Sequence, residues 1–128
     1  MISVNELMLG DYITLTESLK DGGELLIFKI IALNNYNGAL VLLKGEEACD
    51  EVEIDNDWCG IPIIPAILEK NGWFFKNGYW TKKGPVRLSW HEKDATLIAG
   101  YWTVPAAIEY VHQIQAVLRL LGLEDIVI

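Results

Sequence analysis

One stretch near the C-terminus has the apolar spacing of an amphipathic helix, and the rest of the chain must cover its apolar face. Apolar residues recur at helical spacing between Pro105 and Leu121: Ala107, Tyr110, Val111, Ile114, Val117, Leu118 and Leu121. Thr103 is placed to cap the first free amides, Pro105 suits a first helical turn, and Gly122 suits the stop. We therefore expect one helix over 105–121 with a single buried face.

Upstream of residue 65 the sequence is typical of short strands separated by turns. Strands are expected at 12–16, 25–33, 39–43, 51–57 and 61–63, where β-branched and aromatic residues lie between Gly-, Asn- and Asp-rich turns. The proline in Ile61-Pro62-Ile63 indicates an edge strand that closes the sheet. Short strands joined by tight turns predict a small bent antiparallel sheet, for which an SH3-like barrel is preferred and an OB-type barrel is the alternative.

The second half combines a short helix, a hairpin and further strands. Pro65 to Asn71 is expected to form a two-turn helix that Gly72 ends. Asn77-Gly78 between aromatic runs predicts a hairpin over 73–81, followed by strands at 85–90 and 95–102 and a last edge strand at 126–128. The predicted fold class is α+β, with a small barrel-like lobe over 1–64 and a hairpin-sheet-plus-helix lobe over 65–128 that share one core.

Composition indicates a globular protein. The 128 residues suit one domain, and an apolar fraction of 52% with five Trp is atypical of a disordered chain. The sequence has no apolar run of the roughly 20 residues that a membrane span needs, and no secretory leader is apparent. We expect a cytoplasmic protein without a membrane partner, whose Cys49 and Cys59 are reduced thiols.

Charge is divided unevenly along the chain. Residues 1–69 hold 3 basic and 13 acidic side chains, and residues 70–128 hold 7 basic and 5 acidic side chains, within a net charge of −8. An acidic chain is a poor non-specific ligand for nucleic acid, because such binding depends on neutralising phosphates. One explanation of this division that needs no ligand is that the acidic stretch 46–57 neutralises the basic hairpin, either within the fold or across a dimer.

Three stretches of the chain, residues 5–13, residues 61–73 and residues 110–115 with Gly122-Leu123-Glu124, match a pattern with an "ELxxGxYV" opening, a central "IPLTEExLLKxGF" and a C-terminal "VHQLQNLY". Together they resemble a family of small uncharacterised bacterial proteins that are often encoded on prophages and other mobile elements. The chain departs from the pattern at Met8, at Ile64-Pro65 and in the missing aromatic after Gln115. The resemblance implies an accessory protein of a mobile element and carries no activity with it.

The last of these stretches places His112, Gln113 and Gln115 on the expected helix. His112 and Gln115 share a face at i, i+3 spacing, so they suit either a recognition face or a general base. The structural interpretation is preferred: His112 or Gln113 bonds to backbone groups of a neighbouring strand, because buried polar groups must be paired.

Sequence signatures of catalysis and metal binding are incomplete. His91-Glu92-x-Asp94 lacks the three or four ligands that zinc requires, and Asp55-Asn56-Asp57 has Ala66 where a calcium loop carries Glu. The sequence has no HExxH, CxxC, GxSxG, P-loop or GxGxxG motif. We therefore predict no catalytic residue, no metal and no cofactor.

The segment from Lys70 to Lys93 is the strongest candidate for binding. It interleaves lysines with aromatic residues, a pattern found on surfaces that stack bases and meet phosphates and equally in sheets with aromatics inside and lysines in water. The residues proposed to bind are Tyr79, Trp80, Lys82, Lys83 and Arg87.

The function predicted from these observations is a non-enzymatic protein-interaction module that binds a protein partner or associates with itself as a homodimer. One alternative is single-stranded nucleic-acid binding through residues 70–93. The other is a small enzyme centred on His112, which requires that imidazole to be exposed in a cleft beside a carboxylate.

Overall fold

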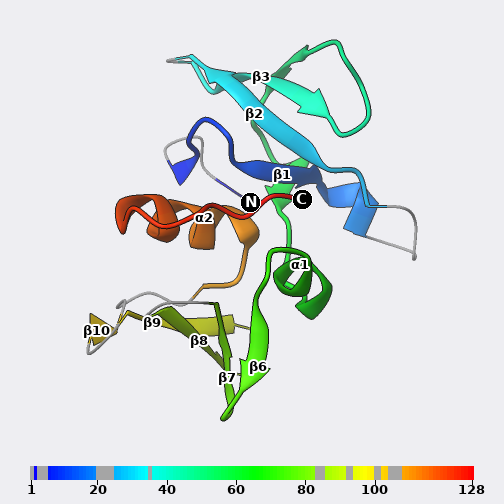
Figure 1. Ribbon diagram of the computed structural model, residues 1–128. Helices are drawn as coiled ribbons and strands as arrows, with labels where there is room; N and C mark the ends of the chain where they lie inside the picture. The colour runs from blue at the N-terminus through cyan, green and yellow to red at the C-terminus, as the bar shows by residue number, and fades with distance from the viewer. Residues whose placement is uncertain are drawn as a thin grey trace.

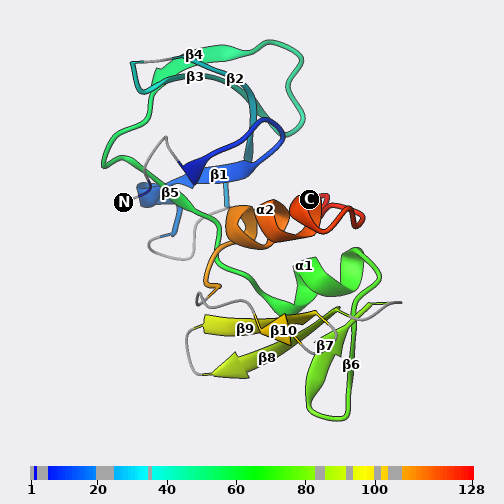
Figure 2. The same cartoon turned by 90° about the vertical axis from the view of Figure 1, so that its left-hand side faces the viewer.

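Two antiparallel sheets, each of five strands, lie on either side of two α-helices (Figure 1, Figure 2). The computed structural model describes residues 2, 6–19, 25–34, 36–82, 86–91, 94–99, 102–103 and 108–128. The fold is α+β, as the sequence predicts, and the two sheets do not share a strand.

The first sheet is a curved meander with its first strand in an inner position. Its strands are β1 (Tyr12–Leu15), β2 (Phe28–Leu33), β3 (Gly38–Leu43), β4 (Asp50–Glu53) and β5 (Trp58–Gly60), in the order β4-β3-β2-β1-β5. A 3-10 turn, η2 (Thr16–Leu19), follows β1. Figure 2 shows the sheet bending strongly, yet among the described strands β4 and β5 remain unpaired edges, so the barrel is not closed.

The prediction that Ile61-Pro62-Ile63 closes this sheet is wrong. The closing strand is β5, which pairs with β1 through Thr14 and Cys59. Residues 61–63 instead run beside the chain that leads into the second helix: Val111 N–H donates to the Ile61 carbonyl at 2.8 Å, and Pro62 forms an isolated bridge with Tyr110. Pro62 has no N–H to offer a sheet ladder, which limits the pairing to this bridge.

The second sheet is built on a tight hairpin. Its strands are β6 (Phe74–Lys76), β7 (Tyr79–Thr81), β8 (Val86–His91), β9 (Asp94–Ala99) and β10 (Trp102–Thr103), in the order β10-β9-β8-β7-β6. Asn77 and Gly78 have φ of 54° and 85°, the left-handed pair that a primed turn requires, which confirms the predicted hairpin. The predicted strand 95–102 is two strands, because Trp102 turns back to pair with Ala99.

The C-terminal edge strand predicted at 126–128 is absent from the described residues. Asn71 takes the place of a neighbouring strand: its amide oxygen accepts from Val127 N–H at 2.7 Å, and its Nδ2 donates to the Val127 carbonyl at 2.9 Å. One side chain therefore satisfies both backbone groups, and the segment needs no sheet.

The helices are α1 (Pro65–Lys70) and α2 (Val111–Leu120). Pro65 stands in the first turn of α1, as predicted. The predicted start of the second helix at Pro105 is wrong, because Tyr110 is extended and its neighbours Glu109 and Val111 bond to Ile63 and Ile61, so the helix begins only at Val111. Thr103 therefore does not cap α2; the Gln113 side chain does, by accepting from Tyr110 N–H at 3.0 Å and Glu109 N–H at 2.7 Å. Pro105 and Ala107 lie outside the described residues.

The end of α2 follows the prediction. Gly122 has a φ of 71°, its N–H donates to the Arg119 carbonyl, and Leu123 N–H donates to the Leu118 carbonyl at 2.8 Å. This is the Schellman arrangement, in which a left-handed glycine lets the chain satisfy the last carbonyls of the helix.

Two hydrophobic clusters result. One fills the concave side of the first sheet, with Ile13, Ile30 and Val41 almost fully buried. The other surrounds α2, whose Ile114 and Leu118 pack with Leu88 of the second sheet, Leu68 of α1 and Tyr12 of β1. The helix thus contacts both sheets, β1 through Tyr12 and β8 through Leu88, while Ile13, Ile30 and Val41 of the first sheet lie in the other cluster.

Gly60 offers a direct test of the contact between β5 and the start of α2. A Cβ on Gly60 would lie 2.6 Å from the Tyr110 Cβ, well inside van der Waals distance. We expect Gly60→Ala to lower the free energy of unfolding by about 2 kcal/mol, as overpacking does, measured by urea denaturation. Tyr110→Gly in the same chain removes the Cβ and ring atoms that the new methyl would meet, so the Gly60 change should then cost less than about 1 kcal/mol. An equal cost in both backgrounds would contradict the packing.

Candidate interaction surface

The outward face of the second sheet carries aromatic and basic side chains. Cross-strand pairing places Phe74 opposite Thr81, Lys76 opposite Tyr79, and Thr81 opposite Arg87. Val86 and Leu88, on the other side of the sheet, are buried against the helices. Side chains alternate along a strand, so Phe74, Lys76, Tyr79, Thr81 and Arg87 face away from the helices. We call Phe74, Lys76, Tyr79 and Arg87 the aromatic–basic surface.

This surface is open to solvent and internally organised. Phe74 is 49% exposed, and Lys76 and Arg87 are exposed as well. The Arg87 guanidinium lies 5.1 Å from the centroid of the Tyr79 ring, a cation–π distance that holds the charge over the sheet. An arginine held in place loses less side-chain freedom when a partner binds.

Two of the predicted binding residues, Tyr79 and Arg87, thus lie together, and the others do not join them. Trp80 is on the opposite face, where its ring lies 5.7 Å from that of Phe75 and it packs against the core around α2. Lys82 makes an ion pair with Glu124 at 3.0 Å, so its charge is already matched within the chain. Lys83 lies outside the described residues.

Phe74 and Lys76 belong to the surface although the predicted binding set omits them. Their placement follows from the register of the hairpin: a two-residue turn at Asn77-Gly78 sets Lys76 opposite Tyr79. The alternation of side chains along β6 then puts Phe74 on that face and Phe75 on the other. The turn signal in the sequence was sufficient to find both residues.

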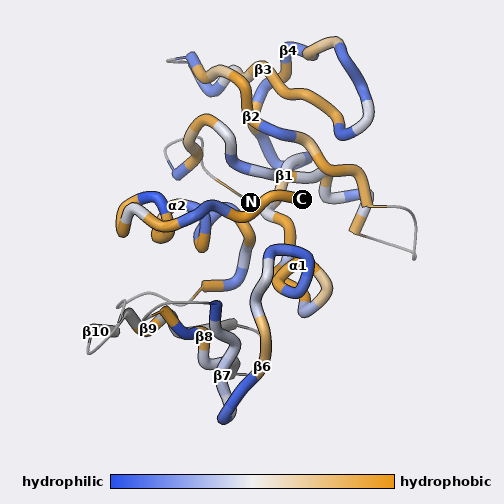
Figure 3. The backbone as a smooth tube through the Cα atoms, viewed as in Figure 1, coloured by the Kyte–Doolittle hydropathy of each residue, from blue (hydrophilic) through white to orange (hydrophobic). Residues whose placement is uncertain are grey.

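The acidic stretch lies at the far end of the molecule. β4 belongs to the first sheet and the β6–β7 hairpin to the second, with the helices between them (Figure 2). Hydrophilic residues gather in the turn after β3 and at the tip of the hairpin, at these two ends (Figure 3). The prediction that residues 46–57 neutralise the basic hairpin within the fold is therefore wrong, because distance and water separate the two groups of charges.

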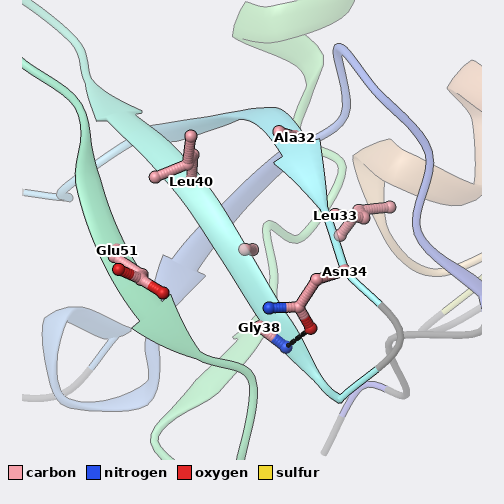
Figure 4. A pocket seen from close by; sticks show the side chains of 7 residues that line it. Ala32, Leu33, Asn34, Gly38, Leu40 and Glu51 are labelled. Atoms are coloured by element: carbon pink, nitrogen blue, oxygen red, sulfur yellow. Dashed lines mark hydrogen bonds between the residues drawn. The ribbon is translucent and has the colours of Figure 1, made fainter.

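A shallow pocket lies beside the acidic strand. It has a volume of about 290 Å³ and its lining includes Ala32 and Leu33 of β2, Leu40 of β3 and Glu51 of β4 (Figure 4). Asn34 shapes one end, since its Oδ1 accepts from Gly38 N–H at 2.9 Å. Leu40 pairs with Glu51, and Gly38 pairs with Glu53, so both carboxylates stand on the same outward face as the pocket. We call Ala32, Leu40, Glu51 and Glu53 the acidic–apolar surface; Leu33 lines the pocket from the side of the buried cluster.

The polar residues of α2 hold the fold together. Gln115 is fully buried: its Oε1 accepts from Tyr12 N–H at 3.1 Å, and its Nε2 donates to the Gly10 carbonyl at 3.1 Å. The strand contact predicted for His112 or Gln113 is made by Gln115 instead, since Gln113 caps its own helix. Arg119, one turn further on, bonds to Asp11 at 2.6 Å and Asp125 at 2.8 Å.

Burial and the neighbouring charges together set the pKa values of Asp11 and Arg119. Burial raises the pKa of the Asp11 carboxyl, although the Met8 amide and the Arg119 guanidinium act to lower it. Partial burial lowers the pKa of Arg119, but the Asp125 and Asp11 carboxylates outweigh that effect and raise it.

His112 does not present an accessible base. Its side chain is 1% exposed, its Nε2 lies 3.2 Å from Glu6 Oε1, and its ring stacks on Tyr110 at 5.8 Å. Among the described residues, the buried Nδ1 finds no hydrogen-bond partner. A carboxylate is within reach, as an enzyme centred on His112 requires, but the exposure that such an enzyme needs is missing.

Neither a protein-family profile, a curated protein nor a solved structure matches the chain. In the part of the chain that the structure describes, no group of His, Cys, Asp and Glu is arranged to hold a metal ion. Nor does any helix in those residues combine the length and apolar character that crossing a bilayer demands.

Proposed function

We propose that this protein is a non-enzymatic interaction module that binds an acidic, partly apolar protein surface through Phe74, Lys76, Tyr79 and Arg87. The observation that carries the proposal is the outward face of the second sheet, on which exposed aromatic and cationic side chains stand without carboxylate partners in the described residues. Aromatic residues and arginine dominate the binding energy of protein interfaces. The resemblance to proteins of mobile elements supports an accessory role.

The first sheet has features that support an SH3-like architecture for the N-terminal half. Its order places β1 between β2 and β5, and its five short strands bend around their own hydrophobic cluster. We propose an open SH3-like lobe that carries the acidic end of the molecule, with the helix-and-hairpin half carrying the basic end.

The experiment is an affinity capture from host lysate, with and without nuclease. The wild-type chain is compared with Phe74→Ser/Arg87→Ser and with the matched control Leu120→Ser/Lys29→Ser, which removes an exposed leucine and an exposed lysine elsewhere. We expect the wild-type chain to capture a partner protein whether or not nuclease is present. This partner should bind Phe74→Ser/Arg87→Ser at least about tenfold more weakly than it binds the wild type or the control. Equal capture by all three chains would refute this surface.

Single-stranded nucleic acid is the competing ligand, since exposed aromatics beside cations also suit bases and phosphates. It predicts capture that nuclease abolishes and an affinity that falls steeply with added salt. That outcome would replace the protein partner with nucleic acid at the same residues.

A further inference from the structure

We propose that the partner of the aromatic–basic surface is the acidic–apolar surface of a second copy of this chain, in a head-to-tail assembly. This inference rests on the proposed function and names its partner. It is carried by the complementarity of the two outward faces, which one molecule holds at opposite ends.

The charges of the two faces match. Lys76 and Arg87 stand on one, and Glu51 and Glu53, all exposed, stand on the other. The ion pairs of the described residues use other side chains: Lys82 with Glu124, Arg119 with Asp11 and Asp125, and His112 with Glu6. The four charges are therefore free to pair between molecules, and such pairing speeds and orients association.

The apolar groups match as well. Phe74, 49% exposed, lies on β6 beside Lys76, and Arg87 lies two strands away on the same face. The pocket beside Glu51 is lined by Ala32, Leu33 and the 39% exposed Leu40. An aromatic ring on a face that carries two cations fits an apolar hollow beside two carboxylates. Seating the ring there removes apolar surface from water on both molecules while the charges at the rim pair.

A head-to-tail arrangement follows from where the faces lie. A symmetric contact of the aromatic–basic surface with itself would set Arg87 and Lys76 against like charges, and the same holds for the two glutamates. Each molecule instead offers one face of each kind, on opposite sides of the helices. Such a heterologous contact leaves one face of each kind free at the ends, so the assembly grows with concentration.

Sedimentation velocity on the purified, nuclease-treated chain tests the inference. We expect the average mass to rise with concentration and the apparent Kd to weaken at least about tenfold between about 0.05 M and about 0.5 M salt. The hairpin variant Phe74→Ser/Arg87→Ser and the pocket variant Leu40→Lys/Glu51→Lys should each weaken self-association at least about tenfold. Leu120→Lys, a matched change at an 86% exposed leucine, should associate like the wild type.

Mixing the two variants gives the decisive result. The hairpin variant keeps an intact pocket and the pocket variant keeps an intact hairpin, so together they should form a 1:1 dimer that does not grow. Circular dichroism and thermal melting show that each variant is folded. A monomeric wild type up to about 0.5 mM at low salt, or a mixture that stays monomeric, overturns the second copy as partner. If the wild type still captures a foreign protein from lysate and the hairpin variant does not, the proposed function stands with another partner.

Discussion

Replacing Gln115 with leucine should lower the free energy of unfolding by about 3–5 kcal/mol, because the change strands buried backbone groups while keeping the volume. The amide accepts from Tyr12 N–H and donates to the Gly10 carbonyl, and no water reaches it, since its side chain is fully buried. Leucine can do neither. Each orphaned group then costs about 1–3 kcal/mol.

Urea denaturation of both chains measures the effect, with the midpoint and slope read separately. Gln113→Leu is the matched control on the same helix. It removes the cap over Tyr110 N–H and Glu109 N–H, groups nearer to water, and should cost about 1 kcal/mol. Similar losses for the two variants would mean that Gln115 is not the clamp between α2 and the first sheet.

Replacing Arg119 with methionine should cost about 2–4 kcal/mol near neutral pH, because it leaves the Asp11 carboxylate buried without its cation. Asp11 is 0% exposed and then keeps only the Met8 N–H at 2.8 Å among its described partners. Asp125→Asn is the control, since it weakens the half-exposed arm of the same cluster and leaves the Asp11 pair intact. We expect that control to cost less than about 1 kcal/mol.

The cost of Arg119→Met should shrink as the pH falls. Burial already raises the folded-state pKa of Asp11 above its ordinary 3.8. The contribution of the protonated carboxyl to folding stability is therefore complete below the unfolded-state pKa, and it is lost as the pH rises through the folded-state pKa. Removing Arg119 takes away an influence that lowers this pKa, so the carboxyl titrates at still higher pH. The variant therefore regains stability relative to the wild type on acidification, when Asp11 takes up its proton.

Unfolding curves at about pH 7 and about pH 4 measure this difference. In an Asp11→Asn background the arginine change should lose most of its cost and its pH dependence, because no buried charge remains. A cost that grows on acidification, or one that Asp11→Asn does not reduce, would contradict the pairing.

Local signals in the sequence determined the elements that depend on a few neighbouring residues. Asn77-Gly78 sets the hairpin register, Pro65 and Gly72 bound α1, and Gly122 ends α2, because each position needs a particular φ or can forgo an N–H. The register alone was enough to place Phe74 and Lys76 beside Tyr79. The alternation of side chains along β6 made two residues of the aromatic–basic surface, Phe74 and Lys76, predictable from the sequence.

Long-range pairing decided the rest. The apolar spacing over 105–121 fits a helix throughout, yet Tyr110 is extended because its neighbours bond to Ile61 and Ile63, residues about 50 positions away in the chain. The same contact removed Pro62 from the first sheet. That Gln115 rather than His112 or Gln113 bonds to the strand depended on how α2 is rotated against β1, a matter of packing across the whole core.

The sequence by itself determined that an acidic half precedes a basic, aromatic half, and which residues alternate along each strand, because composition and period are local properties. Only the tertiary structure decided that the two charged faces lie on opposite sides of the helices, because the second sheet turns its inner face to the core around α2 while the first sheet bends around a cluster of its own. Burial of those inner faces leaves the outward faces unmatched within one molecule. That is the physical reason why we propose a partner for both.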